Sequence, residues 1–145
     1  MRIYQLHLIV EEFASHFFGR ERLFFHLFKE YDKAFGEKKH ILEKQIRFIT
    51  KPIKILKIKR HMRLSLQRNK CFYANKGTYY IDINKRSFAQ LEMTDRCIVI
   101  RASGNYEAET IFFEVLRKCE PSFLAIDSDR QRCAWLKPIK ERKFV

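Results

Sequence analysis

Hydrophobic and polar residues alternate at the start of the chain and then follow a helical spacing. The alternation over residues 2–10 predicts a strand. Three helices are expected after it, over residues 11–18, 20–34 and 37–49. The second of these has apolar side chains three and four positions apart, which makes one apolar face, at Phe24, Leu27, Phe28 and Tyr31. The N-terminal part of the chain therefore predicts a strand followed by amphipathic helices.

Residues that end a helix separate these segments. Gly19 can adopt the left-handed conformation that closes a helix without a Cβ clash. Lys51 precedes Pro52, and a residue before proline disfavours the helical region. Residues 53–66 fit both a helical stripe and a strand alternation, and we favour a helix there. The helix over 37–49 is expected to carry near one side the residues Ile41, Leu42, Gln45, Phe48 and Ile49.

In the C-terminal half of the chain, strand-like patterns outnumber helical ones. Strand-like runs separated by polar turns favour antiparallel pairing, and they cover residues 78–84, 87–93, 97–102, 122–126 and 132–136. Asn105 is a good N-cap for a helix between the third and fourth of these runs. Its apolar stripe is expected at Ala108, Ile111, Phe112, Val115 and Leu116. The predicted fold class is α+β, with a small antiparallel sheet packed against several helices.

The composition agrees with one compact domain over residues 1–145. Hydrophobic residues make up 46% of the chain and charged residues 32%, with 4 Gly and 3 Pro, which argues against disorder. No stretch approaches the apolar length of a membrane-spanning helix, and the N-terminus lacks the pattern of a signal peptide. We therefore expect a cytoplasmic protein without membrane contact.

Catalytic motifs are missing from the sequence. It contains no glycine-rich phosphate loop, no nucleophile elbow and no H-E-x-x-H zinc motif. The carboxylate pairs Glu11–Glu12 and Asp127–Asp129 are interpreted as a solvated helix face and a turn. The four cysteines are widely spaced, which favours free thiols over disulfides or a metal site. We expect no enzymatic activity, no cofactor and no small-molecule substrate.

The net charge of +13 suggests an anionic partner. Residues 51–70 carry eight Lys or Arg and no acid, including Lys54, Lys57, Lys59, Arg60 and Arg63. Such a run can follow a phosphate backbone while nearby rings stack on bases, with Phe72, Tyr79 and Tyr80 as candidates. The other interpretation is a solvated helix face whose charge aids solubility. A weak contact with DNA through this basic patch is the alternative function.

The 14 Phe residues include three within EEFASHFFGRE, residues 11–21. Phe13 and Phe17 are four positions apart and form one ridge on a helix, while Ala14 and Phe18 can face the core. Because a short helix cannot easily bury three rings, the ridge is a candidate contact surface. The alternative is that Phe13 and Phe17 both belong to the core.

Four blocks of the sequence resemble the sporulation inhibitor of replication family, the SirA-like proteins of spore-forming Firmicutes. They are EEFASHFFGRE (11–21), EKQIRFITKPI (43–53), ASGNYEAETIFFEVLRKCEPSFLAI (102–126) and WLKPIKERKFV (135–145). The first and third blocks are long and specific, whereas residues 54–100 match poorly. The resemblance implies an inhibitor of chromosome replication in sporulation that binds domain I, the N-terminal domain of the initiator DnaA.

The resemblance also implies which residues contact DnaA. The aromatic pair of the family falls on Phe13 and Phe17, and its glutamine falls on Gln45. A member of the family has tyrosine where this chain has Phe17, so the ring is kept here and the hydroxyl is missing. Neighbouring residues expected to add to the contact are Arg20, Ile46 and Phe48.

Overall fold

The computed structural model describes residues 1–17 and 19–137, which form seven strands and five helices. The strands are β1 (Arg2–Leu8), β2 (Phe72–Asn75), β3 (Thr78–Ile83), β4 (Ser87–Met93), β5 (Ile98–Gly104), β6 (Phe123–Asp127) and β7 (Arg132–Trp135). The helices are α1 (Glu11–His16), α2 (Glu21–Lys33), α3 (Gly36–Ile49), α4 (Ile55–Leu66) and α5 (Glu107–Cys119). The predicted α+β class is confirmed.

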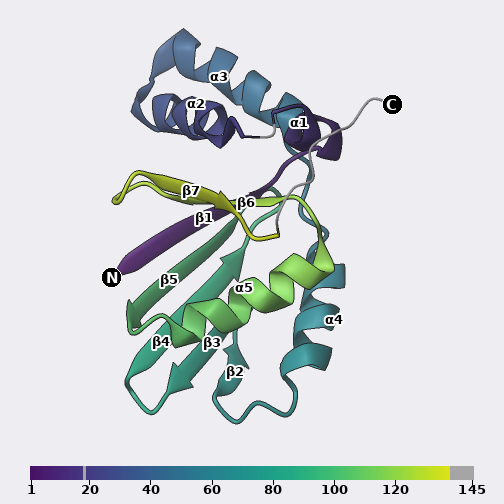
Figure 1. Ribbon diagram of the computed structural model, residues 1–145, viewed down its shortest axis with the longest axis vertical. Coiled ribbons are helices and arrows are strands. Elements are labelled where there is room, and N and C mark those ends of the chain that lie inside the picture. Colours follow the sequence, from purple (N-terminus) through teal and green to yellow (C-terminus); the bar gives the residue numbers. More distant parts are fainter. Residues whose placement is uncertain (18, 138–145) are drawn as a thin grey trace.

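All seven strands join one antiparallel sheet in the order β2-β3-β4-β5-β1-β6-β7. The first strand of the sequence thus lies between two late ones, and Leu6 is opposite both Ile98 and Ala125. Pairing at this sequence separation ties the N-terminus to the C-terminal half. The C-terminal end of β1 leads directly into α1 and so into the helical layer (Figure 1).

One face of the sheet is covered by α4 and α5, and the side chains between the sheet and these helices form the first core. Helix α4 buries Ile58, Met62 and Leu66 there because these residues are spaced along one helical face. Helix α5 adds Ala108, Phe112 and Leu116. Its acidic first turn and basic last turn also complement the helix dipole.

Among the described residues, the helices α1, α2 and α3 cover the opposite face at one end. These helices lie together beside β6 and β7, while β2 to β5 extend away from them (Figure 1). The second core between helices and sheet consists of Ile9, Ala14, Phe24, Phe25, Phe28, Leu124 and Ile126. Since β6 lies between both cores, all five of its residues are buried.

A buried ion pair fixes the start of β1 to α5. The guanidinium of Arg2 donates to both carboxylate oxygens of Glu109, and the acid is 1% exposed. Arg2 also donates to the carbonyl oxygens of Gly104 and Asn105 and lies over the ring of Tyr106. These contacts raise the pKa of Arg2, mainly through its hydrogen bonds to Glu109. The pair satisfies two charges that would otherwise be costly to bury.

Most predicted elements are confirmed within a few residues, including the helix over residues 53–66. Strand β2 was not predicted. The helix expected over residues 11–18 ends at His16, and Phe17 is its C-cap residue. The helix after Asn105 has Tyr106 as N-cap, while the side chain of Asn105 accepts a hydrogen bond from the N–H of Glu107. The expectations for Phe18 and for residues 138–145 lie outside the described residues.

The predicted apolar side of α3 is partly wrong. Leu42 is buried, and Ile49 is half-buried and packs against the second core. Ile41 and Phe48 are instead 50% and 72% exposed. Helix α3 packs against α2 and α1 along a narrow stripe, so the flanks of the predicted apolar side are left at the surface.

Candidate partner-binding surface

Helix α1 turns Phe13 and Phe17 to the same side. Backbone N–H groups of Ala14 and Phe17 donate to the carbonyl oxygens of Val10 and Phe13 at 3.0 Å, so the helical spacing extends to Phe17. Ala14 is 1% exposed and faces the second core. Both phenylalanines are half-buried and pack against the edge of that core. They are therefore neither free surface rings nor full core residues.

Phe13 meets α3 through Phe48. The centroids of the two rings are 5.3 Å apart and the rings are tilted by 53°. Backbone contacts hold the helices in this position, because the N–H of Val10 donates to the carbonyl oxygen of Ile49 at 2.8 Å. Ile9 and Thr50 add an isolated antiparallel bridge beside it. The exposed ring of Phe48 thus extends the aromatic surface from α1 to α3.

Phe17 rests on a chain of aromatic contacts that reaches the sheet. Its ring packs edge-on against Phe24 of α2 at 5.6 Å, and Phe24 packs edge-on against Trp135 of β7 at 5.9 Å. The indole N–H of Trp135 donates to the carboxylate of Glu21 at 3.0 Å. This packing holds the ring of Phe17 in one orientation before any partner arrives.

Gln45 lies on the outer side of α3, between two exposed apolar residues. Ile41, Gln45 and Phe48 are spaced by four and three positions, so they share one helical face. We call the set Phe13, Phe17, Ile41, Gln45 and Phe48 the α1–α3 surface. Ile41 was not among the predicted site residues, although the sequence placed it on the same side of the helix as Gln45 and Phe48. Its position one helical turn before Gln45 was the sequence signal that could have identified it.

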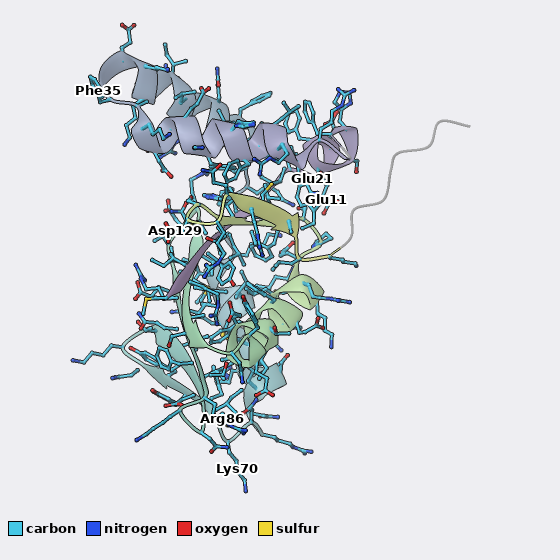
Figure 2. The ribbon with its side chains drawn as sticks, turned by 60° about the vertical axis from the view of Figure 1, so that its left-hand side comes forward. Glu11, Glu21, Phe35, Lys70, Arg86 and Asp129 are labelled. Atoms are coloured by element: carbon cyan, nitrogen blue, oxygen red, sulfur yellow. The ribbon has the colours of Figure 1, made fainter. Side chains whose placement is uncertain are left out.

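Ile46 and Arg20 flank the α1–α3 surface in different ways. Ile46 is half-buried and packs against the second core, so it supports the surface from below. Arg20 is exposed at the start of α2, after Gly19 with its positive φ of 78°. Figure 2 shows Glu11 and Glu21 at this end of the helical layer and Phe35 at the other end. Lys51 and Glu11 complete a charged rim with an ion pair of 3.9 Å.

Hydrogen bonds from Arg96 hold the C-terminal end of α3 against the sheet. The guanidinium of Arg96, in the turn before β5, donates to the carbonyl oxygens of Arg47 and Thr50 at 3.2 and 3.1 Å. Beside it, the ring of His7 stacks on Phe28 with centroids 4.1 Å apart. Burial lowers the pKa of His7 to about 4. Its Nε2 atom is enclosed and has no hydrogen-bond partner among the described residues.

The predicted basic patch lies on the other side of the sheet, on α4 and the residue before it. Four of its members are exposed and Lys59 is half-buried. Lys57 forms an ion pair of 2.8 Å with the buried carboxylate of Glu120. Helix α4 packs in the first core, whereas the α1–α3 surface lies over the second core.

The structure divides the aromatic residues that we expected to accompany this patch. Phe72 and Tyr79 stack on each other and pack against the first core, on the side of α4. Tyr80 follows Tyr79 in β3 and therefore points to the opposite face. The expectation of one site that combines the basic helix with all three rings is corrected accordingly.

No helix in the described residues is long and apolar enough to cross a membrane. Within the same residues, no group of three or more His, Cys, Asp or Glu is placed to hold a metal ion. The four cysteines are free and half-buried. Burial raises the pKa of Cys97 to about 11, so its thiol is protonated at neutral pH and a weak nucleophile.

Fold and surface together define an α+β protein that presents an exposed aromatic surface on a layer of helices. A family model described as "Sporulation inhibitor of replication protein SirA" matches residues 2–140. The chain is also 49% identical, over 148 residues and 99% of each sequence, to "Sporulation inhibitor of replication protein SirA" of Bacillus subtilis (strain 168). The chain therefore belongs to the SirA family of sporulation inhibitors of replication, a family of regulators by its description, and the predicted resemblance is confirmed.

Proposed function

We propose that the protein stops new rounds of chromosome replication during sporulation by binding domain I of the initiator DnaA in the cytoplasm through the α1–α3 surface. Membership of the SirA family supports the replication inhibitor. The observation that carries the binding surface is the contact of Phe13 with Phe48, next to an exposed Gln45. It places the two implied partner-binding segments side by side.

The chemistry of the surface suits recognition of a protein. Aromatic side chains lose little conformational entropy on binding and bury much apolar area, which is why they dominate binding energy at interfaces. Phe17 is held by Phe24, so its ordering cost is met within the folded protein. The amide of Gln45 can both donate and accept one hydrogen bond beside the rings. A charged rim around Arg20 can orient the partner.

Inhibition by this route requires occupancy and no chemical step. When domain I is bound to the α1–α3 surface, the residues of domain I in that interface cannot make another contact. The strength of inhibition then follows the affinity of the complex and the ratio of the two proteins. No cofactor and no small-molecule substrate is needed.

Co-purification of tagged domain I with the full chain tests the proposal. Wild type should be retained, and Phe13→Ala should be lost while its circular dichroism and melting temperature stay close to wild type. Because Phe13 is half-buried, Gln45→Ala serves as a second variant at an exposed position. Retention of both folded variants at the wild-type level would reject the proposed surface.

A further inference from the structure

Half of the second sheet face has no helix on it among the described residues. Strands β3, β4 and β5 pack against α5, and that packing is on the side of the first core. Helices α1 to α3 lie beside β6 and β7, at the other end of the sheet (Figure 1). We call the uncovered region the open face. Side chains alternate along the strands, so its members include Tyr73, Tyr80, Phe88, Gln90, Val99 and Arg101.

Three aromatic rings form a ladder across the open face. Tyr73 of β2 is directly opposite Tyr80 of β3, and their rings stack with centroids 4.9 Å apart and an interplanar angle of 13°. Phe88 of β4 lies 6.2 Å from Tyr80. Tyr73 is 49% exposed, and the other two rings are half-buried. The ladder therefore leaves aromatic surface accessible on strands at the edge of the sheet.

Polar and cationic groups continue the ladder. Tyr80 is opposite Gln90, and Gln90 is opposite Arg101, so one row crosses four strands from an aromatic to a cationic end. Arg101 pairs with Glu92 at 3.6 Å, with both side chains partly exposed. The amide of Gln90 also donates to Glu92 at 2.8 Å, so the row ends in a partly exposed cluster of polar groups. An apolar partner would remove water from this cluster, whereas a polar ligand with flat rings would match the whole row.

The border of the open face is basic. The turns that join β2, β3 and β4 carry exposed Lys76, Lys85 and Arg86. Lys70 precedes β2, and Figure 2 shows Lys70 and Arg86 at the end of the molecule remote from α1 to α3. Asp82, in β3 directly opposite Phe88, is an acid on the open face, and it accepts a hydrogen bond from the backbone N–H of Lys85. The whole chain carries +13, so an anionic partner is favoured at any exposed basic border.

We propose that the open face binds single-stranded nucleic acid, with bases stacked on Tyr73, Tyr80 and Phe88 and phosphates near the basic border. Each base has an aromatic face, and stacking on a protein ring contributes about 1–3 kcal/mol per base. Unpaired bases are required, because rings on a sheet cannot reach bases that are stacked in a duplex. Lysine and arginine at the border neutralise phosphates and make the binding salt-dependent.

This site is separate from the α1–α3 surface and does not depend on the proposed function. Its residues belong to β2 to β5 and the turns between them, whereas the α1–α3 surface belongs to the helical layer. Loss of one activity in a variant should leave the other intact.

Fluorescence anisotropy of the full chain with a labelled oligothymidylate tests the proposal, with oligouridylate and a duplex of equal length as parallel probes. Binding to the single-stranded DNA or RNA probe should be tighter than to the duplex and should weaken as salt is raised. Tyr80→Leu should weaken binding at least about fivefold, the ratio that corresponds to ~1 kcal/mol. Tyr106→Leu is the matched control, since Tyr106 is an exposed tyrosine next to Arg2 on the side of α5.

Several results would overturn the proposal. One is the absence of binding to either single-stranded probe at low salt; another is duplex binding as tight as single-strand binding. Equal affinity of folded Tyr80→Leu and wild type, with loss in Lys54→Gln/Arg60→Gln/Arg63→Gln, would assign the contact to α4. A wild-type dimer in sedimentation that Tyr80→Leu converts to a monomer would show that a second copy of the chain occupies the open face.

Discussion

Phe13 and Phe48 lie 35 positions apart in the sequence, and their rings are in contact at 5.3 Å between centroids. The contact exists because the backbone of Val10 is hydrogen-bonded to Ile49, which draws the start of α1 against the end of α3. Two segments that the family resemblance singles out thereby become one surface.

Phe17→Tyr should strengthen binding to domain I. The ring of Phe17 packs against Phe24, and a hydroxyl added to this ring can make one more hydrogen bond with the partner. A net hydrogen bond contributes about 0.5–1.5 kcal/mol, which corresponds to roughly two- to tenfold in affinity. Titration calorimetry of both proteins with domain I measures the difference, and an unchanged or weaker affinity would contradict the prediction.

Gly104→Ala should strongly destabilise the fold. Gly104 has a φ of 79°, and an added Cβ would lie 2.1 Å from the carbonyl oxygen of Arg86. The clash is with backbone that also accepts the N–H of Asn105, so it cannot move freely. We expect a loss of about 3 kcal/mol or more in the free energy of unfolding, measured by urea denaturation.

Gly77→Ala provides the matched control for this substitution. Gly77 has nearly the same φ, 80°, but an added Cβ meets nothing within 4 Å. Only the left-handed conformation is then penalised, at about 1–2 kcal/mol. Equal losses in the two variants would show that the close approach to Arg86 is not what requires glycine at position 104.

Glu109→Gln should cost about 3–5 kcal/mol of stability, because it leaves the buried Arg2 without its counter-charge. The double variant Arg2→Met/Glu109→Leu removes both charges and should recover most of that loss. Thermal melts and urea denaturation of the single and double variants measure the coupling. A double variant as unstable as the sum of its single changes would argue against the ion pair as the cause.

Stability should fall in mild acid because of His7. Its pKa is about 4 in the folded protein and about 6.5 when unfolded, so the unfolded chain binds more protons between these values. The contribution of neutral His7 is therefore fully present above about pH 6.5 and is lost as the pH falls toward 4, by roughly 2–3 kcal/mol.

His7→Phe isolates this effect, because phenylalanine keeps a ring against Phe28 and cannot be protonated. Urea denaturation of both proteins at about pH 7 and about pH 5 should show a smaller loss in the variant. Parallel losses would assign the acid sensitivity to other groups.

Local periodicity predicted the helices and most strands because most of these elements have one apolar face. Strand β2 was missed since its residues are mostly exposed and show no alternation of apolar and polar types. The central position of β1 depends on pairing with Ile98 and Ala125, which no local pattern contains. Long-range pairing therefore set the limit of the sequence-based prediction of the fold.

The candidate site was predictable only in part for a related reason. Spacing identified Phe13 and Phe17 as one ridge, but Phe48 joins them through tertiary contacts. Ile41 was not predicted as a site residue, because helical spacing does not reveal which residues at the edge of the packed stripe are exposed. The opposite directions of Tyr79 and Tyr80 follow from alternation once the strand is known, and the structure then separates the open face from α4.

Titration calorimetry of domain I with wild type, Phe48→Ala and Phe35→Ala tests the central claim most directly. Both phenylalanines are highly exposed, at 72% and 87%, so neither substitution should affect folding. Phe48 belongs to the α1–α3 surface. Phe35 is the N-cap residue of α3 and lies at the other end of the helical layer (Figure 2). We predict a loss of at least about tenfold in affinity for Phe48→Ala, or ~1.4 kcal/mol, and no change for Phe35→Ala. Wild-type affinity of Phe48→Ala, or an equal loss in both variants, would contradict the account.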